Sequence, residues 1–136
     1  MKKLFTNSVL VKAQSNEVKR ILLDPMSLIK WNPVIAEITK IDDKTFAIHR
    51  DVEALNKDEV ISISPVENQI IYSSTSGRLE YQLIFSLIEE NLFTSIKEVF
   101  YTSDETKLPM VLLKPIAKNA FNSNLIQLKE IIEQLN

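Results

Sequence analysis

Cysteine is absent from this 136-residue chain, and glycine occurs only once, as Gly77. Without a thiol the chain cannot form a disulfide, use a cysteine nucleophile or build a cysteine-ligated zinc site. Phosphate-binding loops and dinucleotide-binding turns need several glycines, because the backbone must approach the phosphate closely. A single glycine excludes both kinds of loop and most nucleotide-dependent chemistry with them, and we expect no cofactor.

Long apolar runs and a dominant charge are also missing. No stretch approaches 18 uninterrupted apolar residues, so we predict no membrane span. Polar residues at positions 6–8 and Lys12 interrupt the apolar segment that a secretion signal would need. Sixteen basic and 18 acidic residues give a net charge of −2, and no block of lysine or arginine indicates a nucleic acid or an anionic membrane. We therefore expect a cytoplasmic protein that binds no nucleic acid.

What remains is the composition of an ordinary globular domain. The hydrophobic fraction is 45% and the charged fraction is 25%. The length is enough for one domain with a real core, and no composition shift or repeat marks a boundary. We therefore predict a single domain over residues 1–136.

The last third of the chain, Pro109 to Asn136, predicts one long amphipathic helix. Its apolar residues recur at spacings of three and four, which places them on one continuous stripe. They are Leu113, Ile116, Ala117, Ala120, Phe121, Leu125, Leu128, Ile131, Ile132 and Leu135. Pro109 suits the start of the helix, and we expect Pro115 to bend the first turns or to delay the regular helix to about that residue.

The rest of the chain is mostly strand. A first strand is expected over residues 2–13, and Ser15 is a plausible cap for a short helix to about Leu23, which Asp24-Pro25 ends. A second short helix over residues 25–30 leads to Trp31-Asn32-Pro33. Six strands are then predicted at 34–41, 45–50, 58–64, 69–74, 79–88 and 92–101, with short turns that imply an antiparallel meander. The polar segment 102–107 connects the last strand to the terminal helix.

This order resembles the helix-grip fold of the START-related superfamily, which includes polyketide cyclases, lipid-transfer START domains and pollen-allergen-like ligand carriers. Three short motifs carry the resemblance at the start, namely Glu17-Val18, Leu23-Asp24-Pro25 and Trp31-Asn32-Pro33, and Leu125–Glu130 resembles the closing helix. Arg20 and Ile21 replace the usual aromatic neighbourhood, and the segment 50–58 lacks the glycine-bearing hairpin of many relatives. The resemblance implies an α+β fold, in which a curved antiparallel sheet of six to seven strands wraps a long C-terminal helix.

A long helix over a curved sheet often leaves a hollow between the two, and we expect a ligand cavity there. The side chains expected to line it are Trp31, Phe46, Ile48, Tyr72, Tyr81, Leu83, Phe85, Met110, Leu113, Ala117 and Phe121. Trp31 could form a wall of the cavity or fill the corner between the short helices and the sheet. Tyr72 and Tyr81 could offer hydroxyl groups to a ligand, or could be core rings whose hydroxyls reach the surface.

Charged residues near the cavity have two interpretations each. Arg50 and Arg78 are expected at its rim, where an arginine could bind a ligand carboxylate, or could be an exposed charge at a strand end. His49 should face solvent if Phe46 and Ile48 face inward. As the only histidine it cannot build a multi-histidine metal site, and we expect no metal. Nearby, Glu53, Asp58 and Glu59 form an acidic cluster that we expect to be solvated, and we assign no catalytic residue.

Three functional hypotheses follow from this sequence. The first is a binding or transport protein for a small hydrophobic ligand, such as a lipid, an isoprenoid or a polyketide-like molecule. The second, which the resemblance implies, is a cyclase or dehydratase that would need inward-facing ionisable groups, of which His49, Tyr81 and Arg50 are candidates. The third is a protein-interaction module, which would have a filled interior and an apolar patch outside for a protein partner.

Overall fold

The computed structural model describes residues 1–103 and 108–135. In chain order the elements are β1 (Lys2–Val11), α1 (Ser15–Leu23), the 3-10 helix η1 (Pro25–Ser27), α2 (Leu28–Trp31), β2 (Ile35–Lys40), β3 (Thr45–Arg50), β4 (Asp58–Val66), β5 (Gln69–Thr75), β6 (Tyr81–Glu90), β7 (Phe93–Thr102) and α3 (Met110–Gln134). These agree with the predicted strands and helices to within a few residues at each end. Most of the predicted connection 102–107 and the last residue of the predicted helix lie outside the described residues.

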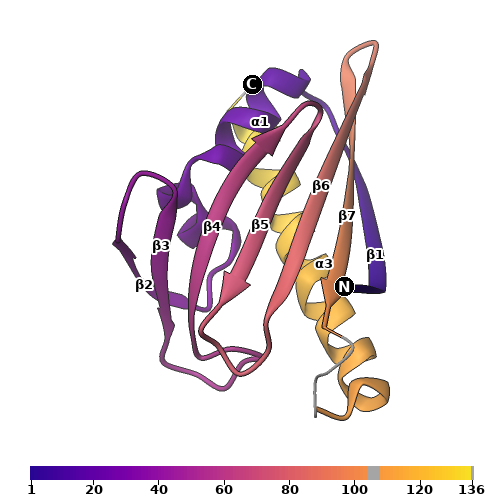
Figure 1. Ribbon diagram of the computed structural model, residues 1–136. Coiled ribbons are helices and arrows are strands. Elements are labelled where there is room, and N and C mark those ends of the chain that lie inside the picture. Colours follow the sequence, from indigo (N-terminus) through magenta and orange to yellow (C-terminus); the bar gives the residue numbers. More distant parts are fainter. Residues whose placement is uncertain (104–107, 136) are drawn as a thin grey trace.

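The seven strands form one antiparallel sheet in the order β1-β7-β6-β5-β4-β3-β2. The first strand pairs with the last, and the other strands follow one another as a meander. The sheet is curved, and α3 lies against one face of it with α1 and α2 beside it (Figure 1). The predicted α+β helix-grip architecture is confirmed.

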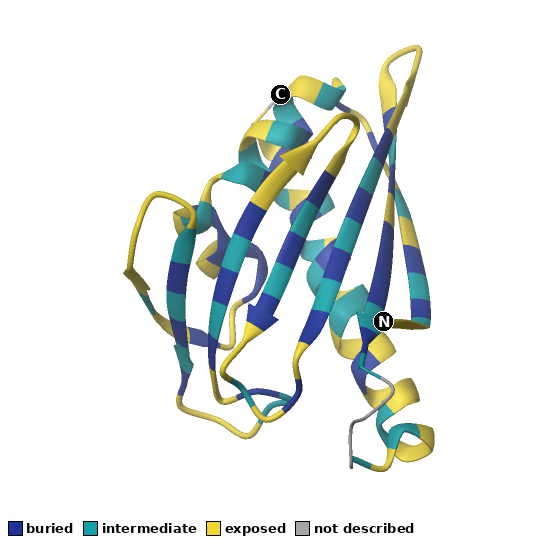
Figure 2. Cartoon of the chain, viewed as in Figure 1, coloured by how far each residue is buried: buried dark blue, intermediate teal, exposed yellow. Residues whose placement is uncertain are grey.

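Side chains alternate between the two faces of each strand, and the face toward the helices is apolar. In β3, Phe46 and Ile48 are buried, and in β6 so are Tyr81, Leu83 and Phe85, while the residues between them are only partly covered. Figure 2 shows this alternation as bands along the strands. Because the side-chain period of a strand is two, each strand contributes one face to the core between sheet and helices.

The start of α1 differs from the prediction. Gln14, rather than Ser15, occupies the N-cap position, and no side chain caps the helix locally. Instead the backbone N–H of Ser15 donates to the carboxylate of Glu89 at 2.6 Å. Glu89 comes from the far end of β6, so a tertiary contact supplies an acceptor for one of the N–H groups that a helix start leaves without an intrahelical partner.

The stripe of α3 is buried in the second half of the helix and exposed in the first. Leu125, Leu128 and Ile132 are fully buried, whereas Ile116 is 68% exposed, contrary to its place in the predicted stripe. Leu135, at the far end, is also exposed. The helix begins at Met110 and contains Pro115, so the predicted delay of the regular helix is wrong. A proline this close to the helix start removes only one backbone donor, and water can reach the carbonyl left free because its neighbours are exposed.

A buried carboxyl group lies under the middle of α3. Glu98 of β7 is fully buried, and one of its oxygens accepts a hydrogen bond from the Asn7 amide of β1 at 3.2 Å. The same amide donates to the backbone carbonyl of Lys118 in α3 at 3.2 Å. Burial raises the pKa of Glu98 to about 8, although the hydrogen bond from Asn7 lowers it. Glu98 is therefore mostly protonated at neutral pH.

None of the helices among residues 1–103 and 108–135 combines the length and the apolar character needed to cross a bilayer.

We expect Glu98 to make the protein less stable as pH rises from about 4.5 to about 8. In this range the unfolded chain releases the Glu98 proton and the folded protein keeps it, so rising pH favours the unfolded state. Glu98→Gln does not titrate, and its free energy of unfolding relative to wild type should increase by at least about 1 kcal/mol between pH 5 and pH 8. Urea unfolding at both pH values measures this difference. The exposed Glu90→Gln serves as the control, and a pH-independent difference for Glu98→Gln would contradict the prediction.

Candidate functional site

A pocket of about 420 Å³ lies between the first half of α3 and one end of the sheet. Its walls come from the segment after α2, the loop between β3 and β4, the adjoining ends of the strands, and α3. The residues that line it are Asn32, Val34, Arg50, Glu53, Ala54, Leu55, Asn56, Glu59, Arg78, Tyr81, Leu113, Ile116, Ala117, Ala120, Phe121 and Asn124. Apolar side chains dominate the helix side, and polar ones dominate the sheet side.

An ion pair buried from solvent forms the polar wall. Arg50 is the last residue of β3 and shares the inner face with Phe46 and Ile48, which directs its guanidinium inward. It donates to the carboxylate of Glu59 on the neighbouring strand β4 and to the carbonyl oxygen of Asn56 at 2.8 Å. Only 7% of Arg50 and 4% of Glu59 is exposed. Both charges are therefore largely removed from water.

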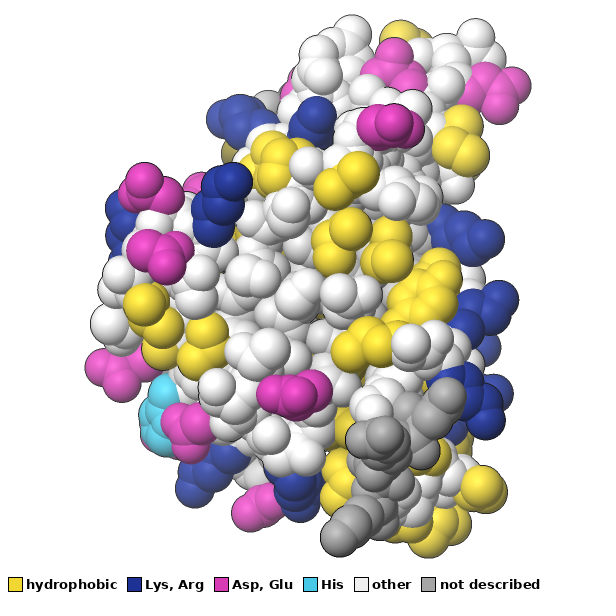
Figure 3. Space-filling model, viewed as in Figure 1, with side chains coloured by type: hydrophobic (Ala, Val, Ile, Leu, Met, Phe, Trp, Pro, Cys, Tyr) yellow, Lys and Arg dark blue, Asp and Glu magenta, His cyan; other side chains and the backbone are white. Residues whose placement is uncertain are grey.

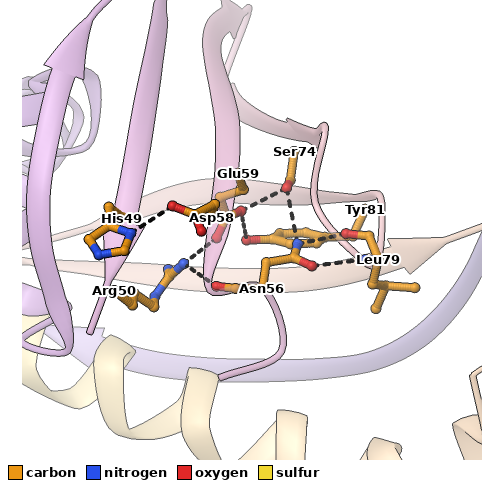
Figure 4. Close-up of polar contacts among 8 residues, drawn as sticks. All are labelled: His49, Arg50, Asn56, Asp58, Glu59, Ser74, Leu79 and Tyr81. Atoms are coloured by element: carbon orange, nitrogen blue, oxygen red, sulfur yellow. Dashed lines mark hydrogen bonds and ion pairs between the residues drawn. The ribbon is translucent and has the colours of Figure 1, made fainter. Parts of the chain in front are cut away.

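The carboxylate of Glu59 also accepts two hydrogen bonds from hydroxyl groups (Figure 4). Ser74 of β5 donates to Oε1 at 2.7 Å, and Tyr81 of β6 donates to the same oxygen at 2.8 Å. Burying a charge costs several kcal/mol unless it is paired and its remaining lone pairs are hydrogen-bonded, so these contacts keep the ion pair in place. Burial and the negative charge of Glu59 raise the pKa of Tyr81 well above its usual range, and its hydroxyl stays protonated.

Asn56 joins the two loops beside the ion pair. Its side-chain amide donates to the carbonyl of Leu79 at 2.7 Å and accepts from the N–H of Leu79 at 2.8 Å. This reciprocal pair links the β3–β4 loop to the segment before β6. Gly77 makes it possible, because a Cβ there would lie 2.5 Å from Cγ of Asn56. The only glycine of the chain is thus required by a close approach of a side chain.

The apolar wall belongs to α3. Phe121 packs on Phe100 and Tyr81, with ring centroids 5.2 and 5.8 Å apart, so one face of the helix is fixed against the sheet. The small side chains of Ala117 and Ala120 lie next to it and do not reach the sheet side, which leaves the pocket open between them.

Six of the residues predicted for the site line this pocket, namely Arg50, Arg78, Tyr81, Leu113, Ala117 and Phe121. Seven do not, and all of these belong to the packed interior or lie against it: Trp31, Phe46, Ile48, Tyr72, Leu83, Phe85 and Met110. The centre of the predicted hollow is filled because the rings of Trp31, Tyr72 and Phe85 contact one another, with centroids 5.2 to 6.2 Å apart. The hydroxyl of Tyr72 is used within the core, where it donates to the carbonyl of Leu22.

Glu59 differs from its predicted position. The sequence predicts a solvated acidic cluster of Glu53, Asp58 and Glu59, but Glu59 is buried at the centre of the polar wall. The alternation along β4 indicates that Glu59 faces inward, because it lies two and four residues before the buried Ile61 and Ile63 on the same face of the strand. Glu53 is exposed and lines the pocket, whereas Asp58 has the opposite parity to Glu59 and is exposed.

His49 lies on the outer face of the sheet, where alternation predicts it, and does not line the pocket. Its Nδ1 pairs with Asp58 at 2.6 Å and its Nε2 with Asp51 at 2.9 Å. These two carboxylates flank the loop whose inner side lines the pocket. The hydrogen bonds that the imidazole donates to Asp58 and, with a smaller effect, to Asp51 raise the pKa of His49 above 6.5. Among the described residues no group of three or more histidine, aspartate or glutamate side chains is arranged to hold a metal ion.

The whole chain superposes on solved structures with which it shares little sequence. A START superfamily protein from Mycobacterium smegmatis matches with a TM-score of 0.79 at 18% identity, over 98% of this chain and 99% of that chain. A polyketide_cyc-like protein from Corynebacterium glutamicum matches with a TM-score of 0.64 at 16% identity, over 97% of this chain and 93% of that chain. A norcoclaurine synthase point mutant from Thalictrum flavum, in complex with a transition state analogue, matches with a TM-score of 0.69 at 7% identity, over 98% of both chains.

No protein-family model matches the chain, and no curated protein matches it in sequence. The structural likenesses establish the fold, which is the helix-grip fold of START-related proteins.

We expect Gly77→Ala to lower the free energy of unfolding by about 1–3 kcal/mol, because the new methyl group displaces the Asn56 amide from Leu79. Urea unfolding measures the loss, and Thr75→Ala, at an exposed position nearby, is the control. In an Asn56→Ala background the same substitution should cost less, since the clash is absent. Equal costs in both backgrounds would contradict this account of the glycine.

We expect an NMR titration to give His49 a pKa above 6.5. Asp58→Asn should lower that pKa more than Asp51→Asn, because the hydrogen bond to Asp58 is the larger cause of the shift. The protonated form is favoured by folding, so its contribution to stability is complete below pH 6.5 and disappears as pH rises through the folded-state pKa. A wild-type pKa at or below 6.5 would contradict the geometry of the two ion pairs.

Proposed function

We propose that this protein binds one small hydrophobic molecule, with a single polar group, in the pocket between α3 and the end of the sheet. The observation that carries the proposal is the pocket itself, about 420 Å³ with an apolar wall opposite a buried, hydrogen-bonded polar wall. Pockets for drug-sized ligands have volumes of about 300–1,000 Å³ and a few oriented polar groups among apolar ones. A lipid, an isoprenoid or a polyketide-like molecule of this size meets the description.

Burial of apolar surface would provide most of the binding free energy. Leu113, Ile116 and Phe121 offer aliphatic and aromatic surface from α3, and Val34 offers more from the opposite side of the pocket. Each Å² of apolar surface removed from water contributes about 25 cal/mol before the entropic costs of association. The size of the apolar part of the ligand would thus set its affinity.

The charges of the pocket favour a neutral polar group on the ligand. The charge of Arg50 is compensated by Glu59, and at the rim Arg78 and Glu53 also carry opposite charges. A ligand carboxylate would compete with Glu59 for Arg50 and leave a buried carboxylate without its partner.

The structural neighbours support a small-molecule function in general terms. One of them is a norcoclaurine synthase in complex with a transition state analogue, so the helix-grip fold can hold a small organic molecule. The interaction-module hypothesis predicts a filled interior, which the pocket does not fit, and an exposed apolar patch, which the first two turns of α3 provide.

An enzymatic function is the second candidate, and one observation favours it. Tyr81 and Glu59 are ionisable, share a hydrogen bond and line the pocket, so they could transfer or stabilise a proton on a bound molecule. Of the three groups that the sequence offers for this role, Arg50 and Tyr81 line the pocket and His49 does not. The fate of the bound molecule separates the two functions: a carrier returns its ligand unchanged, and an enzyme returns a different compound.

Native mass spectrometry of freshly purified protein, followed by organic extraction, tests the proposal. We expect a stoichiometric hydrophobic adduct in the wild type. Ala120→Trp should remove it, because the indole fills the pocket from an α3 position that the core does not need. Ala36→Trp makes the same change at an exposed position of β2 and should retain the adduct.

The extracted compound is then added back to wild-type protein and to Tyr81→Phe. Recovery of the unchanged compound from both supports the carrier, and conversion by the wild type alone supports the enzyme. An adduct that survives in Ala120→Trp would contradict the proposed pocket.

A further inference from the structure

The first two turns of α3 present apolar side chains to solvent. Val111 is 89% exposed, and Leu112 and Ile116 are each 68% exposed. Pro115 is also exposed. It lies next to Val111 on the helix surface, because residues four apart lie on the same side of a helix. We refer to Val111, Leu112, Pro115 and Ile116 as the α3 tip. Contiguous exposed apolar clusters on protein surfaces often mark a site of interaction with another protein or with a membrane.

The α3 tip is continuous with the mouth of the pocket. Ile116 belongs to the tip and also lines the pocket. Leu113, which is not part of the tip, lines the pocket as well. Across the pocket, Val34 is 47% exposed and lines it from the segment after α2. An apolar molecule leaving the pocket would therefore pass over exposed apolar side chains at this end of the protein.

Positive charge accompanies the tip. Residues 108–129 contain Lys114, Lys118 and Lys129 but no aspartate or glutamate, although the whole chain has a net charge of −2. Lys114 and Lys118 are exposed and lie beside the tip on the helix. Figure 3 shows hydrophobic and basic side chains side by side at the end of the molecule where α3 begins. The sequence contains no basic block, and Asp104, Glu105 and Glu130 flank this range in the sequence, so the combination belongs to the first turns of α3 themselves.

We propose that the α3 tip docks on the surface of an anionic lipid bilayer. Its aliphatic side chains would enter the boundary between headgroups and acyl chains, and Lys114 and Lys118 would approach the lipid phosphates. This contact is peripheral, because it uses two turns of one helix. It extends the proposed function by placing the mouth of the pocket against the source or destination of a hydrophobic ligand.

A second copy of the chain fits the surface less well. A stable protein interface buries about 800 Å² on each partner and takes some 20–30 residues, roughly five to seven times the four residues of this tip. In a two-fold dimer the same patch faces itself, which would bring the lysines of both copies together. A bilayer needs no complementary shape, and its negative surface potential matches the charge of the tip.

Vesicle co-sedimentation tests the proposal with two leucines of nearly equal exposure. Leu112 is 68% exposed in the tip, and Leu92 is 67% exposed at the β6–β7 turn. Wild-type protein should sediment with phosphatidylcholine vesicles that contain phosphatidylglycerol, and less with phosphatidylcholine alone. Leu112→Glu should weaken that binding at least about tenfold, whereas Leu92→Glu should leave it unchanged. Circular dichroism of both variants verifies that they are folded.

A second set of variants tests the role of positive charge by comparing lysines beside the tip with a lysine far from it. The double variant Lys114→Glu, Lys118→Glu should lose the preference for anionic vesicles, and Lys44→Glu, at the opposite edge of the sheet, should keep it. Absence of binding to either vesicle, or equal losses in the two leucine variants, would overturn the proposal. So would a wild-type dimer that Leu112→Glu converts to a monomer, since the tip would then bind a second copy.

The pocket-filling variant Ala120→Trp separates this inference from the proposed function. If it sediments like wild type but shows no adduct, docking and ligand binding are both supported as distinct properties. If wild type sediments but never carries an adduct, docking is supported and the proposed function fails.

Discussion

The buried ion pair between Arg50 and Glu59 is the constraint on which the pocket depends. Two charges away from water are tolerated only when they are paired and their remaining polar atoms are hydrogen-bonded. Ser74 and Tyr81 meet that need for the carboxylate, and the carbonyl of Asn56 accepts from the guanidinium. Because these partners come from β3, β4, β5, β6 and a loop, satisfying one buried pair fixes the whole end of the sheet that lines the pocket.

The helix α3 divides its length between packing on the sheet and lining the pocket. Leu125, Leu128 and Ile132 are fully buried and attach its second half to the sheet. Its first half contributes the small residues Ala117 and Ala120, which leave space that larger side chains would fill. A hollow in a protein core forfeits packing energy, and a firmly packed second half lets this domain tolerate one. The exposed tip at the beginning of the same helix is a further departure from a buried stripe.

Fold similarity alone does not choose between a carrier and an enzyme. Solved structures that share 7 to 18% of the sequence have the same architecture, and their names include both an enzyme and a START superfamily protein. Function is carried by the groups that line a site rather than by the fold around it. For this chain those groups are a compensated charge pair, a protonated tyrosine and an apolar helix face, and the proposed preference for a neutral polar group rests on them.

The sequence alone determined the order of the elements and the facing of most side chains, because periods of two and 3.6 are local properties. It predicts His49 outside and Phe46 inside, and the alternation along β4 also specifies the buried position of Glu59, although the acidic composition of its neighbourhood favours a solvated cluster. Only the tertiary structure decided which inward residues meet. The curvature of the sheet and the mutual packing of rings such as Trp31 and Tyr72 filled the centre of the predicted hollow. The same curvature and packing leave the pocket at one end of the sheet, where Arg50 and its partners converge from strands far apart in the chain. No local sequence pattern specifies such a convergence.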